Sequence, residues 1–429
     1  MSARRTLPEG ARRGWCPSLA RPMPTGDGLL ARVHPPLGRL TPDQMRAVAE
    51  GARAHGNGHI DVTARGNLQI RGVSEQSAPR LACALAEAGL ADTRDDGGPQ
   101  RLTLTAPLAG LDESENIDVP ALARAVEAAG LAVPGLPPKT LVAVDGAGTF
   151  GLGAVDADFF LFAKGRAQVA FGLAGADGPM RYGLLPEIRA AGALGLALAA
   201  FAGTGKRRVR DLDSTERAFV AAAAGFHPLE PAPLAPAPSP AAPGLAPLPE
   251  GRAAVLVQAP FGRCTADRLV RVAALAGPEG ARLSPERGLA LVAPAGDTAA
   301  LQAALAQAGF IVSPDDPRRA VFACPGAPAC RSGTTPVPDH AARLAEALAP
   351  LAGLGLTAHV SGCHKGCAHP GPADLTLVAR DGAYDVVPRG EPGDTPATRL
   401  AFEAALDRIR KAAAAGCPAL DLAFGNDLR

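Results

Sequence analysis

A chain of 429 residues is longer than one ordinary hydrophobic core can serve, so we expect two or more domains. Because 43 basic residues are balanced by 42 acidic ones, the net charge of +1 argues against a nucleic-acid or membrane-surface partner bound through bulk electrostatics. Aromatic residues make up only 4% of the chain, so its cores must be built from Ala, Leu and Val.

The sequence predicts neither a secretory signal nor a membrane span. Residues 1–22 contain five arginines and no apolar segment of the kind that signals need. An Ala/Leu/Gly run at 190–203 is shorter than the roughly 18 residues of a membrane helix and is better explained as a buried helix. We therefore expect a cytoplasmic protein. In that reducing compartment, eight cysteines indicate metal ligation, catalysis or plain burial rather than a disulfide framework.

The first regular pattern along the chain predicts a β-α-β-β unit. Thr41 is a good N-cap for its helix, since Pro42 occupies the first helical position and Gln44 completes a capping box. The sequence Gly-Asn-Gly at 56–58 ends this helix. The strands are expected at apolar or alternating runs, namely residues 29–33, 59–63 and 68–73.

The same unit recurs in the second half of the chain. Residues 36–43 read PLGRLTPD and residues 260–267 read PFGRCTAD, with five of eight positions identical, which indicates an internal duplication. Between the copies, the Pro/Ala tract at 227–251 has almost no charge and is predicted to be an extended connector that packs no core. A second pair of matching strands follows the two copies, at 140–144 and 159–163, then at 320–323 and 375–379.

Four cysteines near the end of the chain predict a metal centre. Cys324 and Cys330 are spaced C-x5-C, Cys363 and Cys367 are spaced C-x3-C, and each pair follows a predicted strand. Thiolates suit the iron sites of a cluster, and the Gly and Pro residues of both loops let the backbone approach the sulfurs. Structural zinc is the main alternative, although its cysteine pairs are usually closer, and incidental burial of four cysteines is the other.

This cysteine pattern in a duplicated chain resembles that of the sirohaem nitrite and sulfite reductases. In that family it holds a 4Fe-4S cluster, and the last cysteine also reaches the sirohaem iron. Residues 63–69, TARGNLQ, are similar to the T-x-R-x-x-x-Q segment that lines the macrocycle site of the reductases. The resemblance covers essentially the whole chain. It implies an α+β, internally duplicated nitrite/sulfite reductase-like fold, with a ferredoxin-like double domain and two α/β lobes around a central site.

The expected domains follow from the repeat order and this resemblance. They are half A (22–95), lobe B (98–226), the Pro/Ala linker (227–251), half A′ (252–315) and lobe B′ (316–425), which carries the cysteine quartet. We expect halves A and A′ to pair into the double domain.

Two anion-handling positions of the reductases differ in this chain. Lys365 precedes Gly366 where the reductases favour Asn, and Leu141 stands where they have a second lysine after Lys139. Three segments are instead similar to the precorrin-3B synthase family of aerobic cobalamin biosynthesis, namely residues 15–18, 24–30 and 361–370.

Resemblance to that family implies that the macrocycle is a substrate. Precorrin-3A, a metal-free tetrapyrrole, would be hydroxylated at C20 with O2, and its ring-A acetate would close a γ-lactone. The implied cofactors are a 4Fe-4S cluster, a possible mononuclear non-haem iron and NADH as the electron source. Because no flavin or nicotinamide domain is visible, we expect an external reductase or ferredoxin to deliver the electrons. The alternatives are a sirohaem-dependent assimilatory sulfite or nitrite reductase and a non-catalytic electron-transfer or zinc-stabilised binding protein.

A substrate with many carboxylates needs several cations, and arginine binds carboxylate bidentately. The candidate substrate-binding residues are Arg32, Arg39, Arg65, Asn67, Gln69, Arg71, Lys139, Arg263, Arg287 and Lys365. Ordinary surface charge is the alternative for each cation, and Arg39 and Arg263 could equally hold the repeated turn. His364 and His369 flank the last cysteine and are the candidate catalytic residues, as iron ligands or proton carriers, or as supporting contacts of the cluster.

The GxGxxG match and the four cysteines outside the quartet are not assigned a function. Residues 146–151 match GxGxxG after a strand, but no helix pattern follows, so we do not expect a dinucleotide site there. Cys16 has no assigned role, and Cys83, Cys264 and Cys417 are expected to be buried bystanders.

Overall fold

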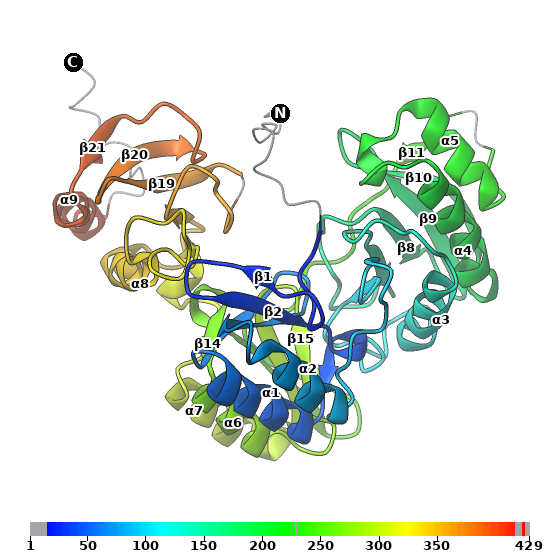
Figure 1. Cartoon of the computed structure of the whole chain (residues 1–429), viewed down its shortest axis with the longest axis horizontal. Coiled ribbons are helices and arrows are strands. Elements are labelled where there is room, and N and C mark those ends of the chain that lie inside the picture. Colours follow the sequence, from blue (N-terminus) through cyan, green and yellow to red (C-terminus); the bar gives the residue numbers. More distant parts are fainter. Residues whose placement is uncertain (1–14, 228–229, 370, 417–422, 425–429) are drawn as a thin grey trace.

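The two copies of the repeated unit form two antiparallel sheets at the centre of the structure (Figure 1). This computed structural model describes residues 15–227, 230–369, 371–416 and 423–424. The first sheet has the strand order β1-β2-β5-β4-β14, and the second has the order β12-β13-β16-β15-β3. The strands are β1 (Met23–Pro24), β2 (Leu29–Val33), β3 (Arg39–Leu40), β4 (His59–Val62), β5 (Leu68–Val73), β12 (Gly244–Leu248), β13 (Arg252–Gln258), β14 (Arg263–Thr265), β15 (Ala281–Ser284) and β16 (Gly288–Pro294).

Each sheet takes an edge strand from the other half of the chain. Strand β14 pairs with β4, where Cys264 lies opposite Ile60, and β3 pairs with β15, where Leu40 lies opposite Ala281. These four side chains are buried in a single core that both halves share. Because neither sheet is complete without the other half, halves A and A′ form one double domain.

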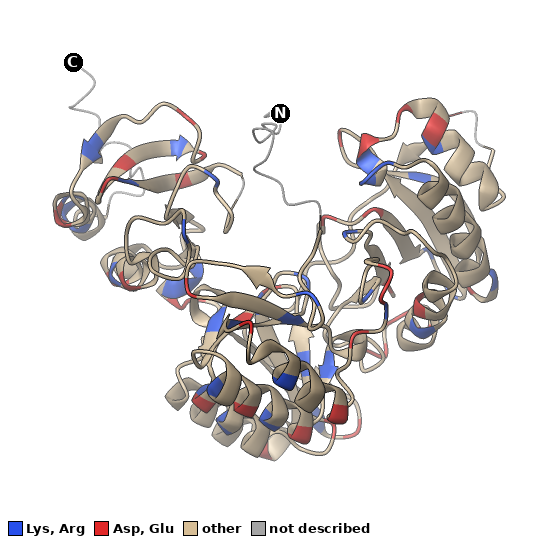
Figure 2. Cartoon of the chain, in the orientation of Figure 1, with Lys and Arg blue, Asp and Glu red and all other residues tan. Residues whose placement is uncertain are grey.

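Four helices cover one side of this double domain. In Figure 1 they lie together on the side away from the two lobes, and Figure 2 shows that Lys and Arg alternate there with Asp and Glu. The helices are α1 (Pro42–His55), α2 (Ala78–Glu87), α6 (Ala266–Leu275) and α7 (Thr298–Gln307). The predicted capping box is present, since Gln44 N–H donates to Thr41 Oγ1 at 3.2 Å and Thr41 N–H donates to Gln44 Oε1 at 3.0 Å.

The repeated motif folds in the same way in both copies. Its second residue has a positive φ, 49° at Leu37 and 57° at Phe261, and the glycine that follows has φ of 70° at Gly38 and 72° at Gly262. Glycine suits this left-handed conformation because it has no Cβ. The short helical turns η1 (Pro36–Gly38) and η3 (Pro260–Gly262) therefore agree with the predicted duplication.

Lobe B is a six-stranded sheet with the order β11-β10-β9-β8-β7-β6. Strands β6, β7 and β8 are parallel, and the rest are antiparallel. Its elements are β6 (Thr103–Thr105), α3 (Val119–Leu131), β7 (Val142–Asp145), β8 (Phe159–Ala163), β9 (Gln168–Ala174), β10 (Pro179–Pro186), α4 (Glu187–Gly203), α5 (Ser214–Ala223) and β11 (Ala232–Pro233). No helix follows β7 within residues 146–158, so the GxGxxG segment lacks the helix of a dinucleotide site, as expected.

Lobe B′ repeats this arrangement with five strands in the order β17-β18-β19-β20-β21. Its first three strands are parallel and its last two are antiparallel. Its elements are β17 (Val321–Ala323), α8 (Val337–Leu348), β18 (Ala358–Ser361), β19 (Ala373–Arg380), β20 (Ala383–Gly390), β21 (Thr398–Leu400) and α9 (Phe402–Ala414). The two lobes flank the double domain on opposite sides in Figure 1. In the described segments, no helix has both the length and the apolar character that crossing a bilayer requires.

The prediction that the Pro/Ala tract packs no core is wrong for its described residues. Leu234, Ala237 and Ala246 are buried, β11 pairs with β10, and β12 pairs with β13. Proline cannot donate to a strand ladder, but both of these strands lie at sheet edges, where that donor is not required. The tract therefore joins lobe B to half A′ as packed edge strands.

Removal of a core side chain should destabilise the double domain. Leu291 on β16 is fully buried, so Leu291→Ala leaves a cavity and is expected to cost about 2–5 kcal/mol of unfolding free energy. Leu245 on β12, an edge strand of the same sheet, is 51% exposed, and Leu245→Ala is the matched control with an expected cost below about 1 kcal/mol. Thermal unfolding of both variants measures the difference, and equal costs would contradict the shared core.

Candidate active site

The four cysteines of the quartet lie on two loops that leave adjacent parallel strands. Cys324 follows β17 and Cys363 follows β18, and these strands pair in parallel register. The carboxyl ends of parallel neighbours meet at one sheet edge, which brings the loops together. Gly362 N–H donates to Cys324 Sγ at 3.1 Å, and a Cβ at residue 362 would lie only 3.3 Å from that sulfur. A larger residue would crowd this sulfur, so glycine suits the close approach of the second loop to the first.

The four cysteines of the quartet lie close enough to affect one another's pKa values. Cys367 is exposed as a residue, but desolvation of its thiol, together with the proximity of the other three cysteines of the quartet, raises its pKa to about 11. Burial likewise raises the pKa of Cys324, to which Cys330 and Cys363 add. Four thiols with an N–H donor to sulfur form a donor set that fits a 4Fe-4S cluster. Within the described residues, no group of three or more His, Cys, Asp and Glu side chains could hold a single metal ion.

The candidate catalytic histidines differ in their surroundings. His364 is exposed, whereas the His369 ring stacks on Phe322 with a centroid distance of 4.3 Å, and its Nε2 lies 3.1 Å from the Pro372 carbonyl oxygen. A third histidine near this site, His359, was not among the candidates from the sequence. It lies on β18, is fully buried with no partner for either ring nitrogen, and is 5.9 Å from the His369 ring.

Two of the candidate substrate-binding arginines are held by carboxylates of half A. Arg71 is 3% exposed and forms ion pairs with Asp27 at 2.9 Å and with Asp61 at 3.1 Å. Its Nη2 also donates to the Ala329 carbonyl at 2.5 Å. Arg263 Nε lies 3.0 Å from Asp61 Oδ1. In this structure both side chains are structural contacts, the alternative that the sequence had left open for Arg263.

Three further candidate cations also contact the protein itself. Arg39 Nη2 donates to the Ala109 carbonyl at 3.3 Å, next to Arg282, which donates to the same oxygen at 3.0 Å. Arg287 Nη2 donates to the Ala368 carbonyl at 3.0 Å. The third is Lys365, whose Nζ lies 3.2 Å from the Ser332 Oγ.

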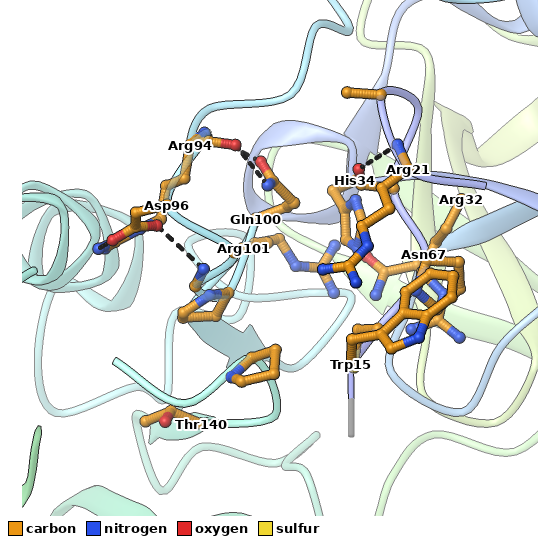
Figure 3. Close-up of a pocket in the computed structure, with 18 of the residues that line it drawn as sticks. Trp15, Arg21, Arg32, His34, Asn67, Arg94, Asp96, Gln100, Arg101 and Thr140 are labelled. Carbon is orange, nitrogen blue, oxygen red and sulfur yellow. Dashed lines mark hydrogen bonds and ion pairs between the residues drawn. The ribbon is translucent and has the colours of Figure 1, made fainter. Parts of the chain in front are cut away.

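Three of the other candidates line a cavity of about 420 Å³ between half A and lobe B (Figure 3). Arg32, Arg65 and Asn67 line this cavity together with Pro138 and Thr140, which flank Lys139. These segments of half A and lobe B contain residues that the sequence had offered as candidates for substrate binding.

Neighbouring side chains and backbone fix two of these arginines. With the Gln69 amide oriented so that its oxygen faces Arg32, that oxygen accepts from Nη2 at 2.7 Å and from Nε at 3.0 Å. Arg65 Nη1 donates to the Lys139 carbonyl at 3.3 Å. These two acceptors are neutral; Arg32 also has a side-chain hydrogen bond with Cys16, and Asp156 and Asp158 are near enough to Arg65 to interact with it electrostatically.

Sequence reasoning missed several residues of the cavity wall. The additional lining residues include Trp15, Cys16, Arg21, His34, Arg94, Gln100 and Arg101. Arg101 Nη1 donates to the Gly66 carbonyl at 2.7 Å, and burial lowers its pKa to about 10, so it remains a cation at neutral pH. No motif marked Arg101; the available signal was its place two residues before β6 of lobe B.

The cavity wall also contains two buried polar atoms without partners, His34 Nδ1 and Asn67 Oδ1. Burial, with Arg32 and Arg101 nearby, holds the pKa of His34 well below its ordinary value. The imidazole is therefore neutral in a wall of cations. Buried polar atoms are normally hydrogen-bonded, so a wall with two free ones is suited to a polar ligand.

Comparisons with known proteins identify the family. The family model "Nitrite/Sulfite reductase ferredoxin-like half domain" matches residues 21–88. A precorrin-3B synthase from Sinorhizobium sp is 37% identical over 406 residues, which are 90% of this chain and 84% of that protein. The chain belongs to the precorrin-3B synthase family. The predicted family membership is thereby confirmed.

More distant relatives of this precorrin-3B synthase family member share its fold or a part of it. Ferredoxin–nitrite reductases from Leptolyngbya laminosa and Synechococcus elongatus are 34% and 32% identical over 114 residues, which are 26% of this chain and 22% of each relative. The solved structure of the Mycobacterium tuberculosis NirA protein covers 94% of this chain and 85% of its own, with a TM-score of 0.66 at 20% identity. The predicted nitrite/sulfite reductase-like fold is thereby confirmed.

Cysteine reactivity should separate the remaining thiols. The expectation that Cys83 is buried is wrong, because this residue is exposed on α2. Cys264 is buried as expected, and burial raises its pKa to about 12. Cys417 lies outside the described residues. In native protein an aromatic disulfide reagent should label Cys83 rapidly and Cys264 only after unfolding. Mass spectrometry of the labelled peptides measures both rates. Fast native labelling of Cys264 would contradict the shared core.

His359 should make the protein less stable in mild acid. Burial, with His369 and Arg287 nearby, lowers the pKa of His359 from 6.5 to about 3. Below about pH 6.5 the unfolded chain therefore binds a proton that the folded chain does not, and stability falls by up to about 1.4 kcal/mol per pH unit. His359→Leu should flatten the decline of the thermal midpoint between about pH 7 and pH 5. Parallel curves for wild type and variant would contradict this.

Proposed function

We propose that this protein is a precorrin-3B synthase, an oxidoreductase of cobalamin biosynthesis. It would hydroxylate precorrin-3A at C20 with O2 and form the γ-lactone with the ring-A acetate. The observation that carries the proposal is the cationic cavity between half A and lobe B, in a chain that is 37% identical to a precorrin-3B synthase over 90% of its length.

The charge of the cavity supports a polycarboxylate ligand. Its wall contains five arginines and two aspartates, namely Arg21, Arg32, Arg65, Arg94, Arg101, Asp95 and Asp96. The hydrogen-bond partners described for Arg32, Arg65 and Arg101 include the Gln69 amide and the carbonyls of Lys139 and Gly66, all of which are neutral. A buried cation gains most from an anion that forms charge-assisted hydrogen bonds with it. Carboxylates of the substrate would supply these anions.

The cofactor proposal concerns the quartet on lobe B′. Cys324, Cys330, Cys363 and Cys367 would hold a 4Fe-4S cluster, which supplies one-electron transfer when bound. A mononuclear non-haem iron, with His364 or His369 as ligands, is a further part of the proposal, although no three His, Cys, Asp or Glu side chains of the described residues are placed to hold a single ion. NADH would be the ultimate electron source, reached through an external reductase or ferredoxin, and the reaction would take place in the cytoplasm.

Within this proposal the chain's own residues bind and orient the macrocycle. Arg32 and Arg65 would hold its carboxylates from half A, and Arg101 would do so from lobe B. His34, held neutral among the arginines, could exchange a hydrogen bond or a proton with the ligand at Nδ1, which lacks a partner in the free protein. Leu141 adds an apolar surface to the wall.

Purification without oxygen, followed by iron, sulfide and tetrapyrrole analysis, tests the proposal. We expect four irons and four sulfides per cluster, no sirohaem, and conversion of added precorrin-3A to its hydroxylated lactone when O2 and reductant are present. The partial matches to nitrite reductases make sirohaem the informative alternative. Stoichiometric sirohaem with sulfite or nitrite reduction would overturn the proposal.

Loss of a cavity cation should weaken substrate binding. Arg65→Met removes a charge-assisted hydrogen bond and should raise the Kd for precorrin-3A by about tenfold to a hundredfold. Arg46→Met is the matched control, because Arg46 lies on the exposed face of α1 with a 52% exposed side chain. Fluorescence quenching measures the affinity, and thermal unfolding verifies the fold of both variants. An unchanged Kd for Arg65→Met would exclude Arg65 as a substrate contact.

A further inference from the structure

The first cysteine loop is attached to half A through one backbone carbonyl. The Ala329 carbonyl, directly before Cys330, accepts hydrogen bonds from Arg71 Nη2 at 2.5 Å and from Gly26 N–H at 3.2 Å. A Cβ at residue 26 would lie 2.4 Å from the Pro328 carbonyl oxygen. The loop and half A are therefore in contact with no spare space between them.

Arg71 is held rigidly for this contact. Its Nε and Nη2 donate to the two carboxylate oxygens of Asp27 at 3.0 and 2.9 Å, and its Nη1 donates to Asp61 at 3.1 Å. Asn57 Nδ2 in turn donates to Asp27 at 3.1 Å. With both of its carboxylate partners inside half A, the guanidinium can direct the second N–H of Nη2 at the Ala329 carbonyl without reorganisation.

The second cysteine loop is attached to half A′ in a similar way. The Ala368 carbonyl, directly after Cys367, accepts from Arg287 Nη2 at 3.0 Å. Arg287 occupies the turn before β16 with φ of 59°. Each half of the double domain thus provides one arginine that binds the carbonyl next to a cysteine of the quartet.

We propose that Arg71 and Arg287 are positioning residues for the cluster site, each fixing one cysteine loop through the carbonyl adjacent to a ligand cysteine. The inference rests on the proposed cluster. A cluster stays bound only while four thiolates keep their mutual geometry, and here that geometry depends on contacts outside lobe B′. Retention of the cluster is therefore coupled to the docking of lobe B′ on the double domain.

The experiment measures how fast the anaerobically purified full chain loses its cluster to an iron chelator. Arg71→Lys keeps the positive charge between Asp27 and Asp61, but a single ammonium lacks the planar fork that also reaches Ala329. Arg263→Lys is the matched control, since Arg263 also pairs with Asp61 while its ion pair involves no residue of the cysteine loops. Gly26→Ala tests the same contact without a change of charge.

We expect Arg71→Lys, Arg287→Lys and Gly26→Ala to lose the cluster about tenfold faster, the factor for one hydrogen bond to a charged group. The electron paramagnetic resonance spectrum of the reduced cluster should shift in these variants, whereas Arg263→Lys should match wild type in both readouts. If Arg71→Lys fails to fold, Gly26→Ala and Arg287→Lys decide the outcome.

Two results would overturn the proposal, and they are distinguishable. Wild-type loss rates in the three loop-contact variants, or equally fast loss in Arg263→Lys, would reject the positioning role while leaving the cofactor in place. Wild-type protein without iron and sulfide would instead reject the proposed cluster itself, and the positioning role with it.

Discussion

The exchange of edge strands between the two halves is the constraint on which the rest of the structure depends. Strand β14 completes the sheet of half A, and β3 completes the sheet of half A′. A backbone ladder at both edges and one shared core make the double domain a single rigid body. Both lobes are built onto this body, so the positions of the cavity and of the cysteine loops follow from it.

The two halves of the double domain make different contacts with their neighbouring lobes. Gly66 N–H donates to Thr63 O, and Arg287 N–H donates to Ser284 O, with φ of 59° at both Gly66 and Arg287. The turns therefore match, as a duplicated unit requires, with Arg287 at the position of Gly66. Arg65 and Arg287 each bind a backbone carbonyl of the adjacent lobe. Next to lobe B this leaves a cationic cavity, and next to lobe B′ it fixes a cysteine loop.

The kind of hydrogen-bond partner distinguishes the arginines held by carboxylates from those that line the cavity. Arg71 and Arg263 form ion pairs with carboxylates, whereas Arg32, Arg65 and Arg101 donate to an amide oxygen and to backbone carbonyls at the cavity. The sequence could not make this distinction, because the partners of Arg71 are 44 and 10 residues away along the chain. Only a folded sheet brings them within 3.1 Å.

The sequence by itself determined what local spacing encodes. Helix α1 follows from the capping box at Thr41, the duplication from a repeated eight-residue motif, and the grouping of the quartet from cysteines placed after parallel strands. Tertiary structure alone decided that the Pro/Ala tract packs as edge strands, that His34 and Arg101 line the cavity, and that Arg71 faces a cysteine loop. The physical reason is range: caps and turns are set by residues a few positions apart, whereas burial and ion pairing depend on segments that meet only after the halves exchange strands.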